Sequence, residues 1–328
     1  MANNLLNDDF SFAALTNAVN SAPVAVGPVS KSELFELNPI NSTEVGLELI
    51  DDNITLIQTS LRGGIADQHP HTSRSLVKLK TSHIRTTATM LADSWLNRAG
   101  FGQGGTPANV IQERDRKLRE MRARVDATMD YQKTRALNGQ ILDADGSVIL
   151  DLFAEFGVTQ QVVECELGTA VTNLGNKIVS ARRLSESVLG MAFASEWIIF
   201  ASAQFIDAMR AHTSFENAVA GWSAASALTA DHRDGSIVVG GAKVIEVPNL
   251  AGKTFIDAGA AFLCPVGVPG LCVTNFAPAD YIESIGELGL PLYAKAEELA
   301  MGRGLVIETQ SNPLSVISRP RAIIKLNA

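Results

Sequence analysis

From Gln112 to Val158 the chain reads QERDRKLREMRARVDATMDYQKTRALNGQILDADGSVILDLFAEFGV, a long charged helix pattern that runs into a short hairpin pattern. Apolar residues at helical spacing form one narrow stripe along the helix: Ile111, Leu118, Met121, Val125 and Met129. Eight Lys/Arg and five Asp/Glu occupy much of the remainder of residues 113–135. The pattern therefore predicts a helix with a single thin apolar face.

The ends of this helix are also marked in the sequence. Pro107 suits a first helical position, and Asn138-Gly139 stops the helix. At 1.5 Å per residue the result is a rod of roughly 45 Å. Its apolar stripe is too thin for burial on all sides, so we expect it to lie across a sheet, with the charged face towards solvent or another copy of the chain.

The hairpin follows directly. Residues 140–142 and 148–150 are short apolar runs that flank Asp143-Ala144-Asp145-Gly146, which has Asp-Gly turn chemistry. The same four residues are similar to the start of a calcium loop, but EF-hand spacing requires glycine at the sixth position and glutamate at the twelfth. Those positions hold Val148 and Ala154, so a hairpin turn is the better interpretation.

This passage resembles the major capsid protein E family of tailed bacteriophages, the lambda-type major head proteins. Two further segments carry the resemblance: FAPAD at 276–280 through LPLYAK at 290–295, and the tail from QSNPL at 310–314 to RPR at 319–321. The three segments have an order and spacing similar to the family. The resemblance therefore spans most of the chain and is weakest over about the first forty residues, which contain no recognised motif.

The resemblance implies an α+β protein with the HK97-like phage capsid fold. It divides the chain into an N-terminal arm (1–44), an extended β-ribbon loop (45–95), a peripheral domain with the spine helix and hairpin (96–154), an axial domain (155–299) and C-terminal strands that return to the peripheral domain (300–328). The implied function is a major head protein that self-assembles into an icosahedral shell around packaged double-stranded DNA.

The implied partners are other copies of the chain, arranged as hexamers and pentamers, together with scaffold and portal proteins. A decoration protein is left open, the DNA is enclosed without sequence-specific binding, and no membrane is involved. We expect no enzymatic activity, cofactor or metal, a location in the virion, and assembly in the cytoplasm of the bacterial host. Basic residues of the ribbon are our candidates for inter-subunit contacts: Arg62, Arg74, Lys78, Lys80 and Arg85.

Composition bounds the function independently of any resemblance. A net charge of −8 argues against general nucleic-acid binding, which requires clustered Lys/Arg. The three cysteines, Cys165, Cys264 and Cys272, lack metal-ligand spacing, so we expect buried free thiols. No Lys or Arg precedes Lys31, so a signal peptide is not expected. Residues 188–206 contain too many polar side chains for a membrane span.

The rest of the chain gives coarser predictions. Residues 1–40 contain only brief apolar islands, at 10–15 and 34–37, and should be either disordered or clamped on a neighbouring surface. Residues 55–60 and 76–88 read as two strands of a ribbon that needs support. Beyond residue 159, helices and strands alternate. Helices are expected at 167–189 and 193–212, and strands at 237–239, 243–247, 270–274, 304–309 and 322–326.

The main rival function is a nucleotide-binding enzyme, because Gly252-Lys253-Thr254 matches the end of a phosphate-binding loop. That loop needs a glycine five positions earlier and a helix afterwards. The earlier position is Val247, and residues 255–259 do not read as a helix, so an ordinary turn is favoured. A shell for small cargo with the same fold, and a soluble binding domain with a disordered arm, are two further alternatives.

Two other patterns point to chemistry only weakly. His69 and His71 with Asp67 could suggest a metal site, but a structural zinc site needs four ligands and no Cys or further His lies nearby. The basic residues of the long helix could contact nucleic acid: Arg114, Arg116, Arg119, Arg122 and Arg124. Interleaved acids reduce the net charge over residues 113–135 to +3 (eight minus five), so a solvated or subunit-facing surface is favoured.

Overall fold

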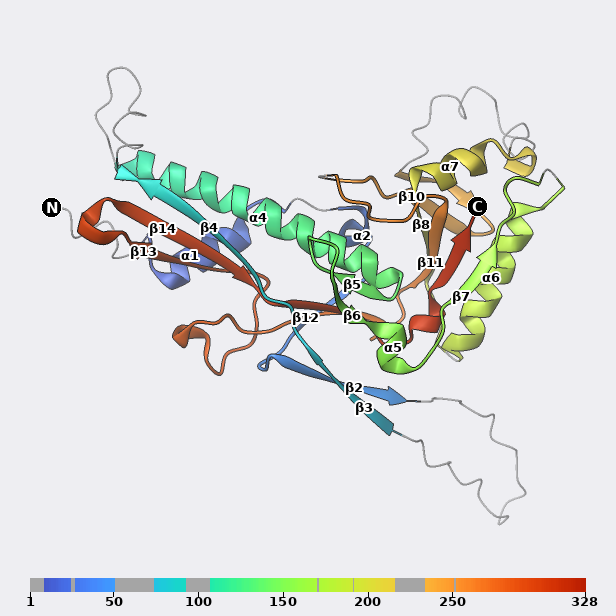
Figure 1. Ribbon diagram of the computed structural model, residues 1–328, viewed down its shortest axis with the longest axis horizontal. Helices are drawn as coiled ribbons and strands as arrows, with labels where there is room; N and C mark the ends of the chain where they lie inside the picture. The colour runs from blue at the N-terminus through green and yellow to red at the C-terminus, as the bar shows by residue number, and fades with distance from the viewer. Residues whose placement is uncertain are drawn as a thin grey trace, which may run out of the picture.

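The computed structural model describes residues 9–24, 27–50, 74–92, 107–169, 171–190, 192–215, 234–250 and 252–328. Helices and strands are mixed along the chain, which confirms the predicted α+β class. The molecule is elongated, with one end built around a long helix and the other around a six-stranded sheet (Figure 1). Among the described residues, no helix is both long and apolar enough to cross a membrane.

The long helix is α4 (Pro107–Leu137), and it begins and ends where the sequence predicts. Gly139 follows it with a φ of 75°, a left-handed conformation that glycine adopts without strain. The chain then forms the predicted hairpin of β5 (Gln140–Leu142) and β6 (Val148–Asp151). The short helix α5 (Leu152–Phe156) comes next, and the Asp151 side chain caps it.

A three-stranded antiparallel sheet lies beside the first part of α4, in the order β13-β14-β4 (Figure 1). Its strands are β4 (Ile84–Leu91), β13 (Tyr293–Glu298) and β14 (Gly304–Ser311). The apolar stripe of α4 is buried in one core with this sheet and with the helix α1 (Phe12–Ser21). This core contains Leu15, Val19, Leu118, Met121, Val125, Leu305 and Ile307.

The six-stranded sheet has the order β7-β16-β11-β8-β10-β9. Its strands are β7 (Gln161–Glu164), β8 (Glu196–Ala201), β9 (Asp234–Val239), β10 (Ala242–Glu246), β11 (Ala260–Val266) and β16 (Ile324–Asn327). The helices α6 (Leu174–Leu189) and α7 (Ala203–Arg210) belong to this end of the molecule (Figure 1). The strand predicted at 237–239 is confirmed within β9. Those predicted at 243–247 and 322–326 overlap β10 and β16, but Ala322 ends a 3-10 turn before β16 begins at Ile324.

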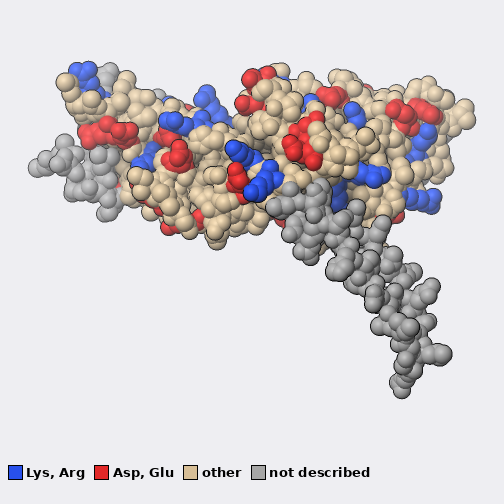
Figure 2. All heavy atoms as spheres, turned by 60° about the horizontal axis from the view of Figure 1, so that its bottom comes forward, with Lys and Arg blue, Asp and Glu red and all other residues tan. Residues whose placement is uncertain are grey.

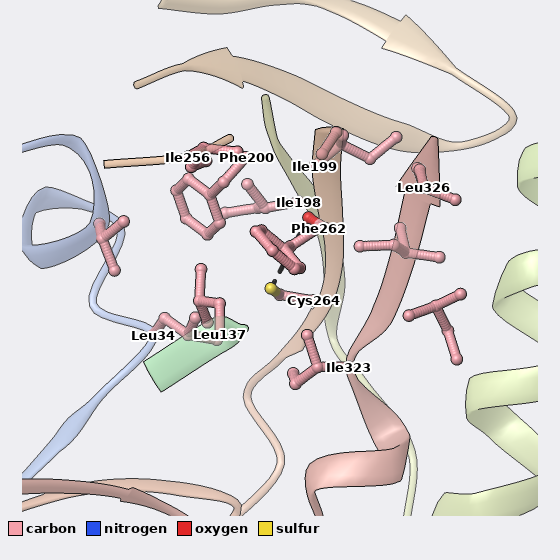
Figure 3. Close-up of a cluster of buried hydrophobic side chains, with 14 of the residues drawn as sticks. Leu34, Leu137, Ile198, Ile199, Phe200, Ile256, Phe262, Cys264, Ile323 and Leu326 are labelled. Carbon is pink, nitrogen blue, oxygen red and sulfur yellow. Dashed lines mark hydrogen bonds between the residues drawn. The ribbon is translucent and has the colours of Figure 1, made fainter. Parts of the chain in front are cut away.

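The last turns of α4 enter the core of the six-stranded sheet. Leu137 points towards Ile198 and Phe262, with Leu34 of the N-terminal segment close by (Figure 3). As a result, nearly every residue from 129 to 137 is buried, including four polar ones: Asp130, Gln132, Lys133 and Thr134. The prediction that the charged face of the helix remains open is therefore wrong for this end, since α4 bridges two hydrophobic cores.

The predicted helix at 193–212 is wrong in its first half. Residues 196–201 form β8, which pairs with both β10 and β11. A strand with neighbours on both sides and burial on both faces loses the apolar-polar alternation that would identify it in the sequence. The helical part begins only after Ser202, whose side chain accepts a hydrogen bond from the backbone of Phe205. Similarly, α6 starts at Leu174, after the cap Asn173, and not at 167.

Residues 76–80 of the ribbon pair with an earlier segment of the chain than the predicted 55–60. β2 (Glu44–Ile50) pairs with β3 (Arg74–Lys80), and residues 55–60 lie outside the described ranges. The expected single run at 76–88 is divided at 81–83 between β3 and β4, which belong to different sheets. Leu79 is buried in the large core, so the base of the ribbon is supported by its own chain.

A second three-stranded sheet joins the two ends of the molecule, in the order β1-β12-β15. It consists of β1 (Glu36–Pro39), β12 (Cys272–Phe276) and β15 (Pro313–Ile317). β12 and β15 are largely buried, whereas all four residues of β1 are exposed. β1 pairs with β12 on one side and ends this sheet.

Candidate functional site

The five predicted contact residues lie in different environments. Lys78 and Lys80 lie on β3, their side chains are exposed, and neither forms an ion pair with any described residue. Between them Leu79 is 2% exposed and fixes this edge of the ribbon to the core. The backbone of Arg74 begins β3, and Arg62 lies outside the described ranges. The described part of the ribbon thus presents two cations that no other described residue neutralises.

Arg85, in contrast, is engaged within its own chain. Its guanidinium contacts the Glu308 carboxylate at 2.6 Å, across the β4-β14 pair. Tyr281 and Gln310 also donate hydrogen bonds to Glu308, at 3.0 and 2.6 Å. Partial burial of Glu308 opposes its ionisation, but the hydrogen bonds from Gln310, Arg85 and Tyr281 outweigh it and hold the Glu308 pKa below its ordinary value.

The N-terminal segment docks on polar groups of α4, which the sequence analysis missed. Arg114 donates to the backbone oxygen of Asp9 and lies over the ring of Phe10. Arg122 donates to the backbone oxygens of Val19 and Asn20, at the end of α1. The basic residues of α4 were predicted to face solvent or another copy, but these two are buried against the chain's own N-terminus.

Further along, α4 holds the short helix α2 (Pro28–Lys31). The Asp130 carboxylate accepts from the backbone nitrogen of Ser30, and Lys133 donates to the Ser30 hydroxyl at 3.3 Å. The apolar islands at 10–15 and 34–37 were expected to be disordered or clamped on a neighbouring surface, and the surface that holds them belongs to their own chain. Phe10, Leu15, Leu34 and Phe35 are buried in the two cores of their own chain. The sequence did contain a signal for this docking: Arg114, Arg122 and Asp130, which hold the N-terminal segment, recur every eight residues along α4.

The partial phosphate-loop motif forms a turn. Gly252 has a φ of 71°, and the backbone nitrogen of Lys253 donates to the oxygen of Leu250. No helix follows within residues 252–259. Instead, Phe255 is buried and packs edge-on against Tyr131 of α4, with 5.1 Å between ring centroids. This segment is shaped by packing and offers no phosphate cradle of the kind that the motif requires.

The other candidate chemical groups that lie within the described ranges are also structural. His69 and His71 lie outside the described ranges, and within those ranges no three His, Cys, Asp or Glu side chains are grouped as a metal site would need. All three cysteines are free and buried. Burial raises the pKa of the Cys165 thiol to about 12, so it remains protonated at neutral pH. The Asp145 carboxylate accepts hydrogen bonds from Ser147 within the hairpin turn, as the turn chemistry predicts.

Charge is dispersed over the surface. Figure 2 shows Lys/Arg and Asp/Glu side chains in small groups of both signs, with no broad basic area on the face in view. On α4, Arg116 is held by Glu113 and Glu120, each at 2.6 Å. Such local pairing of charges does not form the clustered positive surface that nucleic-acid binding requires.

Comparisons with known proteins agree with this architecture. A family model described as phage major capsid protein E matches residues 11–328. The major capsid protein of Pseudomonas phage KPP10 is 23% identical over 98% of this chain and 97% of its own length. The major capsid protein of Salmonella phage Felix O1 is 25% identical over 56% of this chain, and the match spans half of that protein's length.

Solved structures share the fold. A prophage protein of E. coli CFT073, described as a capsid protein, superposes with a TM-score of 0.57 and 12% identity, over 94% of this chain and 96% of its own. The SrpI encapsulin of Synechococcus elongatus PCC 7942 gives a TM-score of 0.50 and 13% identity, over 92% and 88%. At these identities the likeness concerns the fold alone. The predicted HK97-like fold, shared by phage capsids and encapsulins, is confirmed.

Proposed function

This chain belongs to the phage major capsid protein E family, and from that premise we propose that its copies assemble into a closed icosahedral shell that holds packaged double-stranded DNA. The observation that carries the proposal is the match of the family model to residues 11–328, nearly the whole chain. The role is structural, because the work of such a protein lies in its contacts with other copies. Neither the motif at Gly252 nor its surroundings favour nucleotide chemistry.

The shape of the chain supports the assignment of its two ends to two domains with different positions in the shell. We assign the end built on α4 and the β13-β14-β4 sheet to a peripheral domain, and the six-stranded sheet to an axial domain near the symmetry axes. The C-terminal residues 300–328 serve both, because β14 and β15, in two different sheets, contact α4, while β16 lies between β7 and β11. α4, which enters both cores, would transmit force between the domains.

The ribbon supports the proposed contacts between copies. An extended two-stranded ribbon is marginal in water beyond the part that packs on a core. Lys78 and Lys80 on β3 are exposed and form no ion pair with the described residues, so a neighbouring copy would supply their carboxylates. Arg62, Arg74 and Arg85 complete the proposed set, although Arg85 already binds Glu308 in its own chain.

The proposed partners are copies of this chain in hexamers and pentamers, a scaffold and a portal protein, with assembly in the bacterial cytoplasm and a final location in the virion. A shell wall built from chains that each carry a net charge of −8 would enclose DNA without holding it tightly. No catalytic role is proposed. A shell that encloses protein cargo remains the nearest rival, because encapsulins share the fold.

Electron microscopy of the purified chain, expressed alone and together with the neighbouring genes, tests this proposal. Closed shells, or hexamer-based sheets and tubes, are the expected result. A homogeneous monomer or small oligomer under both conditions would refute self-assembly. The contents of particles isolated from infected cells separate the rival functions, since a phage head holds double-stranded DNA and a cargo compartment holds protein.

A further inference from the structure

The connection between β12 and β13, residues 277–292, projects from the body of the molecule (Figure 1). Four large apolar side chains lie exposed within nine of its residues: Ile282 (86%), Ile285 (78%), Leu288 (60%) and Leu290 (42%). Single exposed apolar residues are common on soluble proteins, but a group of four on one projecting loop indicates an interaction site. We call residues 281–290 the apolar loop.

Hydrogen bonds to residues on either side brace the apolar loop. Ser284 Oγ donates to the backbone oxygen of Ala279 at 2.6 Å, within a 3-10 turn at Ile282–Ser284. The backbone nitrogen of Gly289 donates to Ile40 at 2.8 Å, just beyond β1. A surface that is already ordered loses little conformational entropy when it binds a partner.

Two aromatic residues support the base of the loop. Tyr281 donates to Glu308 of β14, and its ring meets Phe12 of α1 edge-on, with 5.8 Å between centroids. Lys295 of β13 lies over the Tyr281 ring and forms an ion pair with Glu283 at 2.7 Å. The loop is therefore braced by the three-stranded sheet and by the docked N-terminal helix together.

The charges around the loop restrict what can cover it. Asp280, Glu283 and Glu287 are exposed beside the apolar side chains, and Lys295 neutralises one of them. An acidic rim repels DNA phosphates and anionic lipid headgroups. The acidic rim would instead attract exposed cations. Lys78 and Lys80 on the ribbon of another copy are such cations.

We propose that the apolar loop docks on a second copy of this chain and is one of the contacts that close the shell. This inference rests on the proposed function. The largest exposed apolar patch on a typical monomer covers on the order of 300–600 Å². A standard interface buries about 800 Å² on each partner. One such contact would not hold a dimer in solution, but it adds to the other contacts that each copy makes in a closed particle.

The test replaces three side chains in one variant, Ile282→Ser, Ile285→Ser and Leu288→Ser, and measures assembly by light scattering and electron microscopy. A matched control, Val171→Ser and Phe193→Ser, removes apolar side chains of similar exposure (93% and 85%) elsewhere on the molecule. A second variant, Ile282→Leu with Ile285→Leu, keeps the apolar area. We expect the serine variant to lose at least about tenfold in particle yield, with the unassembled protein melting as the wild type does, while the control and the leucine variant assemble normally.

Assembly of the serine variant at the wild-type concentration, or an equal loss in the control, would overturn the inference and leave the proposed function intact. If the serine variant fails to fold, the single change Ile282→Ser, at the most exposed of the four positions, is measured in its place with the same criterion. Failure of the wild type to form particles under any condition would instead refute the proposed function, and this inference with it.

Discussion

The carboxylate of Asp130 accepts a hydrogen bond of 3.0 Å from the backbone nitrogen of Ser30, although Asp130 is only 2% exposed. This contact joins α4 to the N-terminal segment at the boundary between the two cores. The second carboxylate oxygen of Asp130, Oδ2, has no hydrogen-bond partner among the described residues. The segment is thus attached to α4 through a buried carboxyl group as well as through apolar packing.

The first prediction concerns the pH dependence of that contact. Burial raises the pKa of Asp130 by more than Ser30 and Lys133 lower it. The folded chain therefore keeps this proton over a pH range in which the unfolded chain has released it, so the group stabilises the fold less as pH rises. Asp130→Asn removes the titration and keeps an oxygen for Ser30. We expect the wild-type Tm to fall relative to the variant between about pH 4 and the folded-state pKa.

Thermal melts of unassembled protein from acidic to neutral pH measure this difference directly. If the wild type gains stability relative to the asparagine variant as pH rises, burial is not the dominant effect on Asp130.

The second prediction separates buried from exposed arginines on α4. Arg122 is 6% exposed, donates to the end of α1 and forms an ion pair with Asp126 at 3.4 Å. Arg122→Met keeps the apolar stem but removes these interactions, which should cost about 3 kcal/mol. Arg124→Met is the matched control, because Arg124 is exposed on the same helix and should change stability by less than about 0.5 kcal/mol.

Urea denaturation of the two variants gives the comparison, and limited proteolysis should cut residues 9–21 faster in the Arg122 variant. Equal losses in both variants would show that α1 is not held by Arg122.

The third prediction concerns a close backbone approach under the apolar loop. A Cβ at Gly289 would lie 1.9 Å from the backbone oxygen of Phe276, so Gly289→Ala must displace the chain. We expect a loss of about 1–3 kcal/mol in the free energy of unfolding. Gly168→Ala is the control, since a Cβ there meets open space, and it should be nearly neutral. A neutral Gly289→Ala would contradict the tight packing of this loop on β12.

The fourth prediction concerns Glu308, whose pKa is held below its ordinary value. A lowered pKa in the folded state means that the ionised carboxylate stabilises the fold above the ordinary pKa, and that this contribution is lost as pH falls through the folded value. Glu308→Gln should therefore cost about 1 kcal/mol at neutral pH, because Arg85 is largely exposed. The difference should shrink in acid. A constant difference across pH would exclude the ion pair as its cause.

The fifth prediction tests the ribbon cations. Lys78→Glu with Lys80→Glu should lower the yield of particles and leave the Tm of the unassembled chain within about 2 °C, since exposed side chains contribute little to folding. Lys31→Glu with Arg321→Glu makes the same change of net charge at two other exposed positions. If both variants assemble equally poorly, net charge and not the ribbon contact is responsible.

The sequence predicts α4 and its hairpin well because their signals are local. Pro107, the apolar stripe and Asn138-Gly139 specify the helix, and Asp143–Gly146 specifies the turn. β8 was missed because its burial depends on β10 and β11, which come later in the chain. The docking of α1 was missed for a similar reason: Arg122 reads as a surface residue until the distant carbonyls that it caps are in place.

The candidate contacts were predictable only in part. In the sequence Val77 and Leu79 alternate with Lys78 and Lys80, as is typical of a strand with one exposed face. The structure shows both lysines exposed. The role of Arg62, Arg74 and the other ribbon cations between copies stays a prediction. The exposure of the apolar loop could not be predicted, because its Ile and Leu residues read as core until the fold shows that nothing in the described chain covers them.

The most direct test of self-assembly is a cryo-EM reconstruction of particles formed by the purified wild-type chain. We expect closed icosahedral shells in which each subunit has α4 and the six-stranded sheet as described, with the apolar loop against a neighbouring copy. Particles without this subunit fold, or a chain that remains monomeric at every concentration tried, would contradict it.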